Sequence, residues 1–209
     1  SAFVVEKDTL GFSFGKKENK LGIRASATRE LVFEDCEIPA GNILGREGIG
    51  FIVAMKTFDQ TRTGIAAQAV GLAQGALNET LAYAHERKTF GKAIISHQAV
   101  QHMLANMATQ IEAARALTYE ASRYCDSGAK DMAKYSSMAK LLSSDVCMQV
   151  TTDCVQIFGG YGYMREYPVE KMMRDAKILQ IYEGTNQIQR NVIGQELNKE
   201  YARIKESFF

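Results

Sequence analysis

The chain has 209 residues, of which 46% are hydrophobic, and its 25 basic side chains nearly balance its 24 acidic ones to give a formal net charge of +1. A chain of this length and composition holds enough apolar material for a buried core, which excludes an intrinsically disordered protein. No stretch approaches the roughly 18 consecutive apolar residues of a membrane span, and no basic block predicts a nucleic-acid surface. The expected partner is a small molecule or another protein.

The first 46 residues have the composition of short strands joined by turns. The runs "AFVV", "FSF" and "ELVFEDCEI" are rich in β-forming residues, and glycines and Pro39 separate them. The opening "SAFVVEKDT" has no signal-peptide character and is typical of a strand that is already under way. Residues 1–46 are therefore predicted to be the end of a β-domain that is too small to close a sheet alone.

Long amphipathic periods begin after residue 46, and after Gly48 the only proline is Pro168. The pattern predicts four long helices, near residues 50–86, 97–126, 131–157 and 185–205. A shorter helix is expected around residues 168–176, with Pro168 in its first turn. Residues 47–209 are thus predicted to form an antiparallel helical bundle, which makes the fold mainly α.

Two of these helices carry apolar residues at three- and four-residue spacing, as a buried stripe requires. The first stripe consists of Val100, Met103, Leu104, Met107, Ile111, Ala114 and Leu117. The second consists of Ile188, Val192, Ile193, Leu197, Tyr201 and Ile204. Both stripes are expected to be buried, partly against another copy of the chain.

Neither the cysteines nor the histidines predict a metal site. No two cysteines have C-x-x-C spacing, and no histidine has a carboxylate or cysteine at metal-ligand spacing. The residues concerned are Cys36, Cys125, Cys147, Cys154, His85, His97 and His102. We expect reduced core thiols, an exposed or capping His85, and methionines that fill gaps between helices.

One acidic side chain stands out in "QIYEGTNQIQR", residues 180–190. Glu183 lies between an apolar run and a predicted helix that Thr185 or Asn186 can cap, and Gly184 leaves room beside it for a ligand. The carboxylate is either a helix-terminal acid that stabilises the helix dipole or a general base held against apolar neighbours. Spacing alone leaves both interpretations open.

Four motifs together resemble the acyl-CoA dehydrogenase family. They are "FDQTR" at 58–62, "ERKTFGK" at 86–92, "QIFGGYGY" at 156–163 and "RDAKILQIYEGTNQIQR" at 174–190, in the family's order and spacing. The resemblance runs along essentially the whole chain and is greatest to the short- and medium-chain members. It covers only the carboxyl-terminal portion of such an enzyme.

The resemblance implies a flavoenzyme of fatty acid β-oxidation that uses FAD to convert a fatty acyl-CoA thioester into the trans-2-enoyl-CoA. Glu183 matches the family's general base, which takes the α proton while a hydride passes from the β carbon to flavin N5. The electrons then go to an electron-transfer flavoprotein. Isovaleryl-type members carry this glutamate at a position matched here by Thr61, and related nitroalkane oxidases use aspartate, so the sequence follows the majority arrangement.

The resemblance also implies binding residues. Cofactor contacts are implied at Arg87, Thr89, Phe90, Gln98, Gln156, Gly160, Thr185 and Gln187, the first three reaching the FAD of a neighbouring subunit. Substrate contacts are implied at Asp59, Arg62, Tyr182 and Gly184, of which Asp59 and Arg62 hold the CoA portion. Spacing by itself gives a plainer interpretation, in which "GGYG" is an ordinary turn and Asp59 and Arg62 form a helix-surface pair.

The family's amino-terminal helical domain and earlier strands have no counterpart here. The sequence therefore predicts a carboxyl-terminal fragment of a dehydrogenase that assembles as a dimer of dimers, in a bacterial cytoplasm or a mitochondrial matrix. The alternative is a non-catalytic helical fragment that serves oligomerisation. Retention of Glu183, Arg87, Gln98 and Gln156 favours the enzyme.

Overall fold

A computed structural model describes residues 1–207 of the chain. Residue contacts divide the chain into two compact units, Ser1–Phe58 and Asp59–Phe209. Helix α1 (Gly50–Glu86) begins in the first unit and continues into the second.

The first unit contains a short antiparallel ribbon of two strands, β1 (Phe12–Phe14) and β2 (Leu31–Phe33). Phe12 lies opposite Phe33 in the ribbon, and their rings stack at 4.9 Å. The expected strand at "AFVV" is reduced to a single bridge between Phe3 and Ile43. A ribbon of two strands buries little surface and is marginal by itself, which agrees with the prediction that this region cannot close a sheet.

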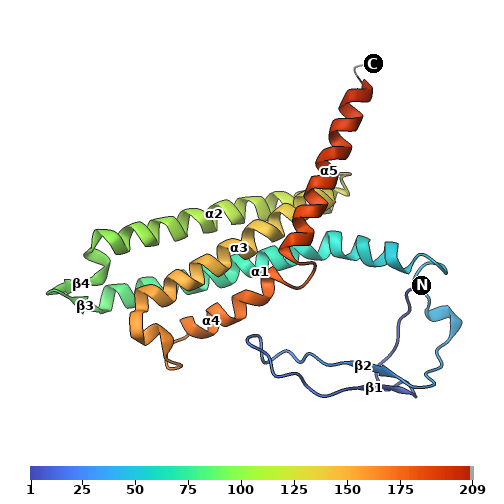
Figure 1. The fold of residues 1–209 in the computed structure, drawn as a ribbon, viewed down its shortest axis with the longest axis horizontal. Coiled ribbons are helices and arrows are strands. Elements are labelled where there is room, and N and C mark those ends of the chain that lie inside the picture. Colours follow the sequence, from blue (N-terminus) through green and yellow to red (C-terminus); the bar gives the residue numbers. More distant parts are fainter. Residues whose placement is uncertain (208–209) are drawn as a thin grey trace. The chain divides into compact units, whose positions relative to one another are not determined.

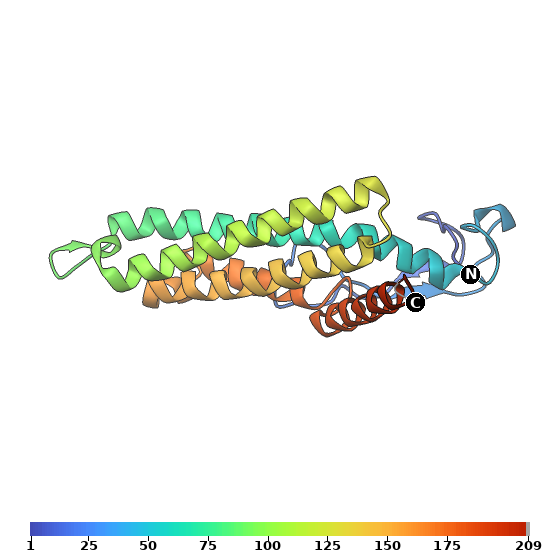
Figure 2. The same cartoon turned by 90° about the horizontal axis from the view of Figure 1, so that it is seen from above.

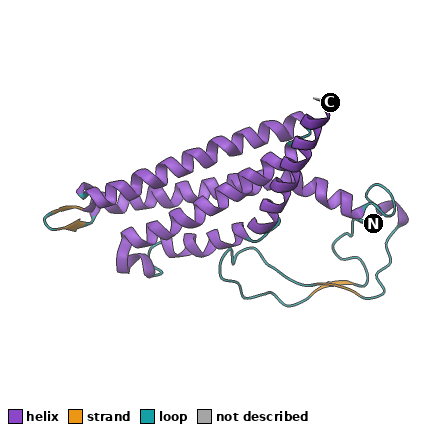
Figure 3. Cartoon of the chain, turned by 45° about the horizontal axis from the view of Figure 1, so that its top comes forward, coloured by secondary structure: helices purple, strands orange, loops and turns teal. Residues whose placement is uncertain are grey.

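The second unit is helical, as predicted. Helices α1, α2 (Gln98–Ser127) and α3 (Met132–Phe158) lie side by side, and the chain reverses direction between them (Figures 1 and 2). They are followed by α4 (Val169–Ala176) and α5 (Asn186–Ser207). The link from α1 to α2 contains a small hairpin of β3 (Lys88–Thr89) and β4 (Lys92–Ala93), visible at one end of the bundle in Figure 3.

The core lies between α1, α2, α3 and α4. In α2, Leu104, Met107, Ile111 and Ala114 are buried, which confirms the stripe predicted there. Helix α1 supplies mainly small residues, Ala69, Val70, Ala73, Ala76 and Leu77. The opposing residues of α3 are Val146, Cys147, Val150, Cys154 and Phe158. Alanines on α1 allow close approach of the helices, so the core is narrow and packed.

The stripe predicted for α5 is not buried in this chain. Ile188, Leu197, Tyr201 and Ile204 are 46%, 48%, 70% and 54% exposed. The reason is that α5 packs on α3 through other positions, chiefly Asn186 and Gln189, which are 4% and 0% exposed. At the amino-terminal end of α5, the residues that pack against α3 are therefore polar.

All four cysteines are free. Cys147 and Cys154 lie in the core as expected, where burial raises the pKa of their thiols to about 12 and about 11, but Cys36 and Cys125 are only half-buried. His85 is exposed in the last turn of α1, as predicted. None of the described helices is long and apolar enough to cross a membrane, and the described residues contain no cluster of three potential metal ligands.

Candidate functional site

Glu183 and Gly184 form a sharp loop between the 3-10 turn Lys177–Gln180 and helix α5. Both residues have left-handed backbone conformations, with φ of 55° at Glu183 and 88° at Gly184. Glycine adopts this conformation readily, whereas for a glutamate it is uncommon and has to be stabilised by its surroundings. A side chain at position 184 would also place its Cβ 2.7 Å from Nε2 of Gln189.

Two buried side chains hold the backbone of this loop. Nε2 of Gln189 donates to the carbonyl oxygens of Glu183 at 3.1 Å and Gly184 at 2.9 Å. Nζ of Lys140, on α3, donates to the Gly184 carbonyl and to Oδ1 of Asn186, both at 2.8 Å. Gln189 and Lys140 are both 0% exposed. The loop is thus fixed from α5 on one side and from α3 on the other.

Thr185 is the residue that caps α5. Its hydroxyl accepts from the Ile188 N–H at 3.3 Å, and its carbonyl accepts from the Gln189 N–H at 3.0 Å. The side chain of Asn186, the other candidate cap, instead points inward and donates to Ser144 Oγ at 2.9 Å and Asp145 Oδ1 at 2.7 Å. Glu183 therefore precedes the amino terminus of α5, as predicted.

The carboxylate of Glu183 is half-buried and meets helix α1. Oγ1 of Thr61 donates to Glu183 Oε2 at 2.6 Å. The two positions that the resemblance matches to the glutamate of different family members thus lie in direct contact here. A hydrogen bond from this hydroxyl fixes the orientation of the carboxylate.

Arg62 lies next to Thr61 but points into the protein, where it is 4% exposed. Its Nη1 donates to Asp59 Oδ1 at 2.8 Å and to Ser137 Oγ at 3.2 Å, while its buried Nε has no hydrogen-bond partner among the described residues. Burial lowers the pKa of Arg62 and raises the pKa of Asp59, and the attraction between the two opposes both shifts. The guanidinium also interacts electrostatically with Glu183.

Tyr182 and Lys140 complete the surroundings of the carboxylate. The Tyr182 hydroxyl donates to Gln68 Oε1 at 2.7 Å, and burial raises the pKa of this tyrosine. Burial lowers the pKa of Lys140 to about 8, against the attraction of Asp145 and Glu183. The predicted residues Asp59, Arg62, Tyr182, Glu183 and Gly184 are therefore brought together around one loop.

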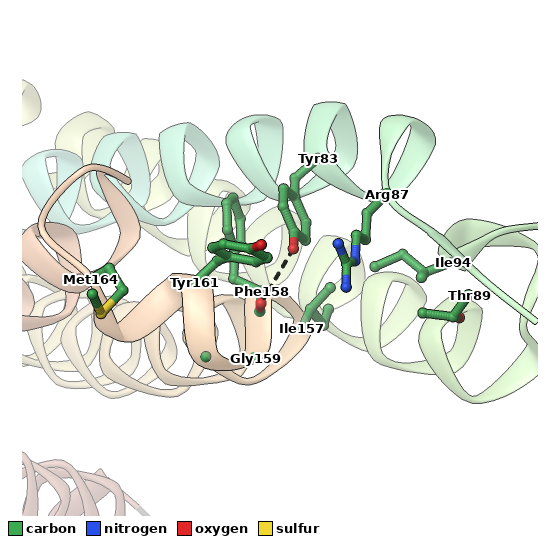
Figure 4. A pocket seen from close by; sticks show the side chains of 10 residues that line it. Tyr83, Arg87, Thr89, Ile94, Ile157, Phe158, Gly159, Tyr161 and Met164 are labelled. Carbon is green, nitrogen blue, oxygen red and sulfur yellow. Dashed lines mark hydrogen bonds between the residues drawn. The ribbon is translucent and has the colours of Figure 1, made fainter.

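Three of the predicted cofactor residues line a separate cavity of about 430 Å³ at the far end of α1 (Figure 4). Arg87, Thr89 and Gly160 lie in its wall, together with Gly159 and the aromatic rings of Tyr83, Phe158 and Tyr161. The Arg87 guanidinium lies 5.4 Å from the centre of the Tyr161 ring. The Tyr83 and Phe158 rings stack at 4.0 Å, which gives the cavity a rigid apolar wall.

The other predicted cofactor residues lie elsewhere. Thr185 and Gln187 line a polar cavity of about 380 Å³ at the start of α5, with Asp145 and Arg190. Phe90, Gln98 and Gln156 are exposed and line neither cavity. Phe90 is 96% exposed at the tip of the β3–β4 hairpin.

Two residues of the site were not found from the sequence, Lys140 and Gln189. For Lys140 a signal was present, because in "SSMAKLLSSDVC" this lysine lies on the same helix face as the buried residues Ser136, Ser144 and Cys147. A charged residue within a buried stripe is a candidate for a functional role. Gln189 gave no comparable signal, because a glutamine in the first turns of a polar helix is common.

The sequence matches the family model described as "Acyl-CoA dehydrogenase, C-terminal domain" over residues 48–198. The chain is 52% identical over 202 residues to the cyclohexane-1-carbonyl-CoA dehydrogenase of Geobacter metallireducens, covering 97% of this chain and 53% of that protein. Among solved structures, it is similar to the butyryl-CoA dehydrogenase of Megasphaera elsdenii, with a TM-score of 0.91 and 51% identity over 93% of this chain and 51% of that one.

A chain from a structure of the electron transferring flavoprotein of Acidaminococcus fermentans is also similar, with a TM-score of 0.92 and 54% identity over 93% of this chain and 51% of that chain. The chain thus spans about half the length of the relatives it matches. The family model matches residues 48–198, and sequence identity and fold agree with it over more than nine-tenths of the chain, so the chain belongs to the acyl-CoA dehydrogenase family.

Proposed function

We propose that this chain supplies the general base of a flavoenzyme that removes hydrogen from the α and β carbons of an acyl-CoA thioester, and that the base is Glu183. The observation that carries the proposal is the placement of the Glu183 carboxylate. It is half-exposed, receives the Thr61 hydroxyl at 2.6 Å, and stands on a loop that buried side chains fix in a strained conformation. An unfavourable backbone conformation that neighbouring side chains maintain is often found at residues that react.

An α proton becomes acidic only if hydrogen bonds stabilise the charge that develops on the thioester oxygen. The backbone N–H of Glu183 donates to no residue in the part of the chain that the structure describes. A donor next to the base is thus available to the thioester oxygen. One residue then provides both the carboxylate that accepts the proton and an amide that polarises the carbonyl.

Members of the acyl-CoA dehydrogenase family are FAD flavoproteins, and the cavity at Arg87 fits part of that cofactor. Arg87 makes no ion pair with any described side chain, and its planar guanidinium suits a pyrophosphate. Gly159 and Gly160 carry no side chain that would keep an anion from the backbone. FAD held by Arg87, Gly159 and Gly160 would supply the acceptor for the hydride that leaves the β carbon.

The remaining predicted residues take the roles of binding groups in this proposal. Asp59 contacts the CoA portion, Arg62 is buried behind Asp59 and orients it, and Tyr182 and Gly184 contact the acyl thioester. Phe90, Gln98, Gln156, Thr185 and Gln187 contribute to the cofactor site. Electrons leave to an electron-transfer flavoprotein, which is supported by the similarity to a chain solved in a structure of such a protein.

The test is Glu183→Gln in the flavin-loaded enzyme that contains this chain. The amide keeps the size of the side chain but cannot accept the α proton, so flavin reduction by butyryl- or octanoyl-CoA should slow by about a hundred- to ten-thousand-fold. Binding of the thioester should persist, because the backbone amide is unchanged. The rate is measured by anaerobic stopped-flow bleaching of the flavin band.

Glu79→Gln is the matched control, because Glu79 is an exposed glutamate on α1 whose side chain forms no described contact. This variant should bleach the flavin at the parental rate. If Glu183→Gln also bleaches at that rate, Glu183 is only a helix-terminal acid and the proposal is wrong.

A further inference from the structure

The buried ammonium of Lys140 is the strongest feature that the proposed function leaves unused. Lys140 is the largest of the fully buried side chains described, with 0% exposure in the first half of α3. Its two hydrogen bonds, each 2.8 Å, end on the Gly184 carbonyl and the Asn186 amide oxygen, and neither partner carries a charge. A buried cation that is not matched by a contacting carboxylate is costly to the fold.

The charged groups around Lys140 come from three directions. Asp145 on α3 and Glu183 in the loop attract the ammonium, whereas Arg62 on α1 repels it. These interactions offset desolvation only in part, since the pKa of Lys140 stays well below its usual range. A methionine of similar length would fill the same space without that penalty. Stability alone therefore gives no reason for a lysine at this position.

The contacts of Lys140 converge on the residue that follows the base. The Gly184 carbonyl accepts from both Lys140 and Gln189, and Gln189 also holds the Glu183 carbonyl. Both loop residues have positive φ, so the loop needs such restraints to keep its shape. A rotation of this short segment would move the carboxylate of Glu183 away from Thr61.

We propose that Lys140 is a positioning residue, which clamps the Gly184 carbonyl and so fixes the left-handed loop that aims the Glu183 carboxylate at its substrate. This inference rests on the proposed role of Glu183 as base. Lys140 itself touches neither substrate nor cofactor in the proposal. Gln189 holds the same loop from α5, and the two side chains act as one clamp.

The central experiment measures flavin reduction in Lys140→Met of the flavin-loaded enzyme that contains this chain. The limiting rate constant with saturating acyl-CoA should fall about 10- to 100-fold, because a small displacement of the base has an effect of that size. The acyl-CoA dissociation constant should change less than about 3-fold, since the lost contacts are to the loop backbone rather than to the ligand. A parental rate, or a loss confined to binding, would overturn the proposal.

Lys134→Met is the matched control. Lys134 lies on the same helix, is 8% exposed and forms an ion pair with Glu200 of α5 rather than contacting the base loop. If Lys134→Met slows flavin reduction as much as Lys140→Met does, the effect is a general one of losing a buried lysine and the proposal fails.

A double-mutant cycle separates positioning from a general structural role. In the Glu183→Gln background there is no carboxylate left to aim, and only the Glu183 backbone N–H still depends on the loop, so adding Lys140→Met should slow the residual flavin reduction much less than it slows the parent enzyme. If Lys140→Met slows the Glu183→Gln variant by the same factor as it slows the parent enzyme, Lys140 does not act by positioning the carboxylate. If Lys140→Met does not fold, Gln189→Met carries the same cycle, because it removes the other half of the clamp.

Failure of this inference is distinguishable from failure of the proposed function. If Glu183→Gln alone bleaches as fast as the parent enzyme, the base has been wrongly assigned. If Glu183→Gln is slow while Lys140→Met and Gln189→Met are both parental, the base stands and the clamp is refuted.

Discussion

The surroundings of the Glu183 carboxylate come from positions far apart in the sequence. Thr61 belongs to α1, Lys140 to α3 and Gln189 to α5, and each makes a hydrogen bond to the side chain or the backbone of residues 183–184. Local sequence cannot encode such a set, because each contact depends on how the helices pack. At the scale of the residue, the function of the loop therefore depends on the tertiary fold.

Lys140 should leave a signature in the pH dependence of stability. Its pKa is lowered from 10.5 to about 8 in the folded protein, so between these pH values the unfolded chain binds more protons than the folded one. The free energy of unfolding should thus rise with pH across this window by on the order of 3 kcal/mol from this group alone. Below pH 8 the lysine is charged in both states and its contribution is constant.

The measurement compares denaturant unfolding of the parent and Lys140→Met at several pH values from 7 to 10.5. The ionisation of Cys147 and Cys154, which acts in the opposite direction above pH 9, is common to both proteins and cancels in the difference. Parent stability relative to the variant should increase with pH above about 8. A difference that does not change with pH would mean that Lys140 is not desolvated as described.

The sequence predicted the loop around Glu183 better than it predicted the side chains that hold this loop. Local sequence rules predict a turn at Gly184 and a helix cap at Thr185, so the loop around Glu183 could be recognised from the sequence. The Thr61 hydroxyl that contacts the Glu183 carboxylate was not accessible from spacing, because it is more than a hundred residues away in the sequence. Lys140 gave a weak signal as a charge on a buried face.

At the scale of the element, periodicity predicted each helix within about two residues, because an apolar stripe at 3.6-residue spacing is a strong local signal. The β3–β4 hairpin was not predicted, since two pairs of residues carry no periodicity. The stripe of α5 was read correctly as apolar, but several of its residues are exposed in the single chain, and their burial against another copy stays a prediction. Spacing shows which residues are apolar, and it does not show which neighbour covers them.

Met107 tests the packing of α2 against the rest of the core. It is 1% exposed, and its sulfur lies 3.9 Å from the Cys154 sulfur of α3. Met107→Ala should lower the free energy of unfolding by about 2 to 5 kcal/mol, because it leaves a cavity between the helices. Thermal unfolding followed by circular dichroism measures the loss.

Met103→Ala serves as the control for Met107→Ala, since Met103 lies on the same helix one turn earlier and is only half-buried. Met103→Ala should lower the free energy of unfolding clearly less than Met107→Ala does. Equal losses at the two positions would contradict the described orientation of α2.

At the scale of the whole molecule, two parts of the candidate site lie far apart on one chain. Thr61 contacts Glu183, and Arg87 follows the last residue of the same helix. At 1.5 Å per residue the two positions are separated by roughly 40 Å. A single cofactor cannot extend from Arg87 to the base of the same chain. The cavity at Arg87 is therefore expected to serve the FAD whose flavin lies beside the base of another copy.

This separation and the exposed residues of α5 together predict a closed homo-oligomer, a dimer or a dimer of dimers. Leu197 and Tyr201 are 48% and 70% exposed, and burial of such side chains against another copy would stabilise the assembly. Leu197→Glu places a charge in that contact and should shift the enzyme toward smaller species with loss of bound FAD. Asn198→Glu, at an exposed polar position one residue later, should leave the assembly intact. Light scattering coupled to size-exclusion chromatography gives the mass, and a parent enzyme that is a stable monomer at micromolar concentration with FAD bound would contradict the expectation.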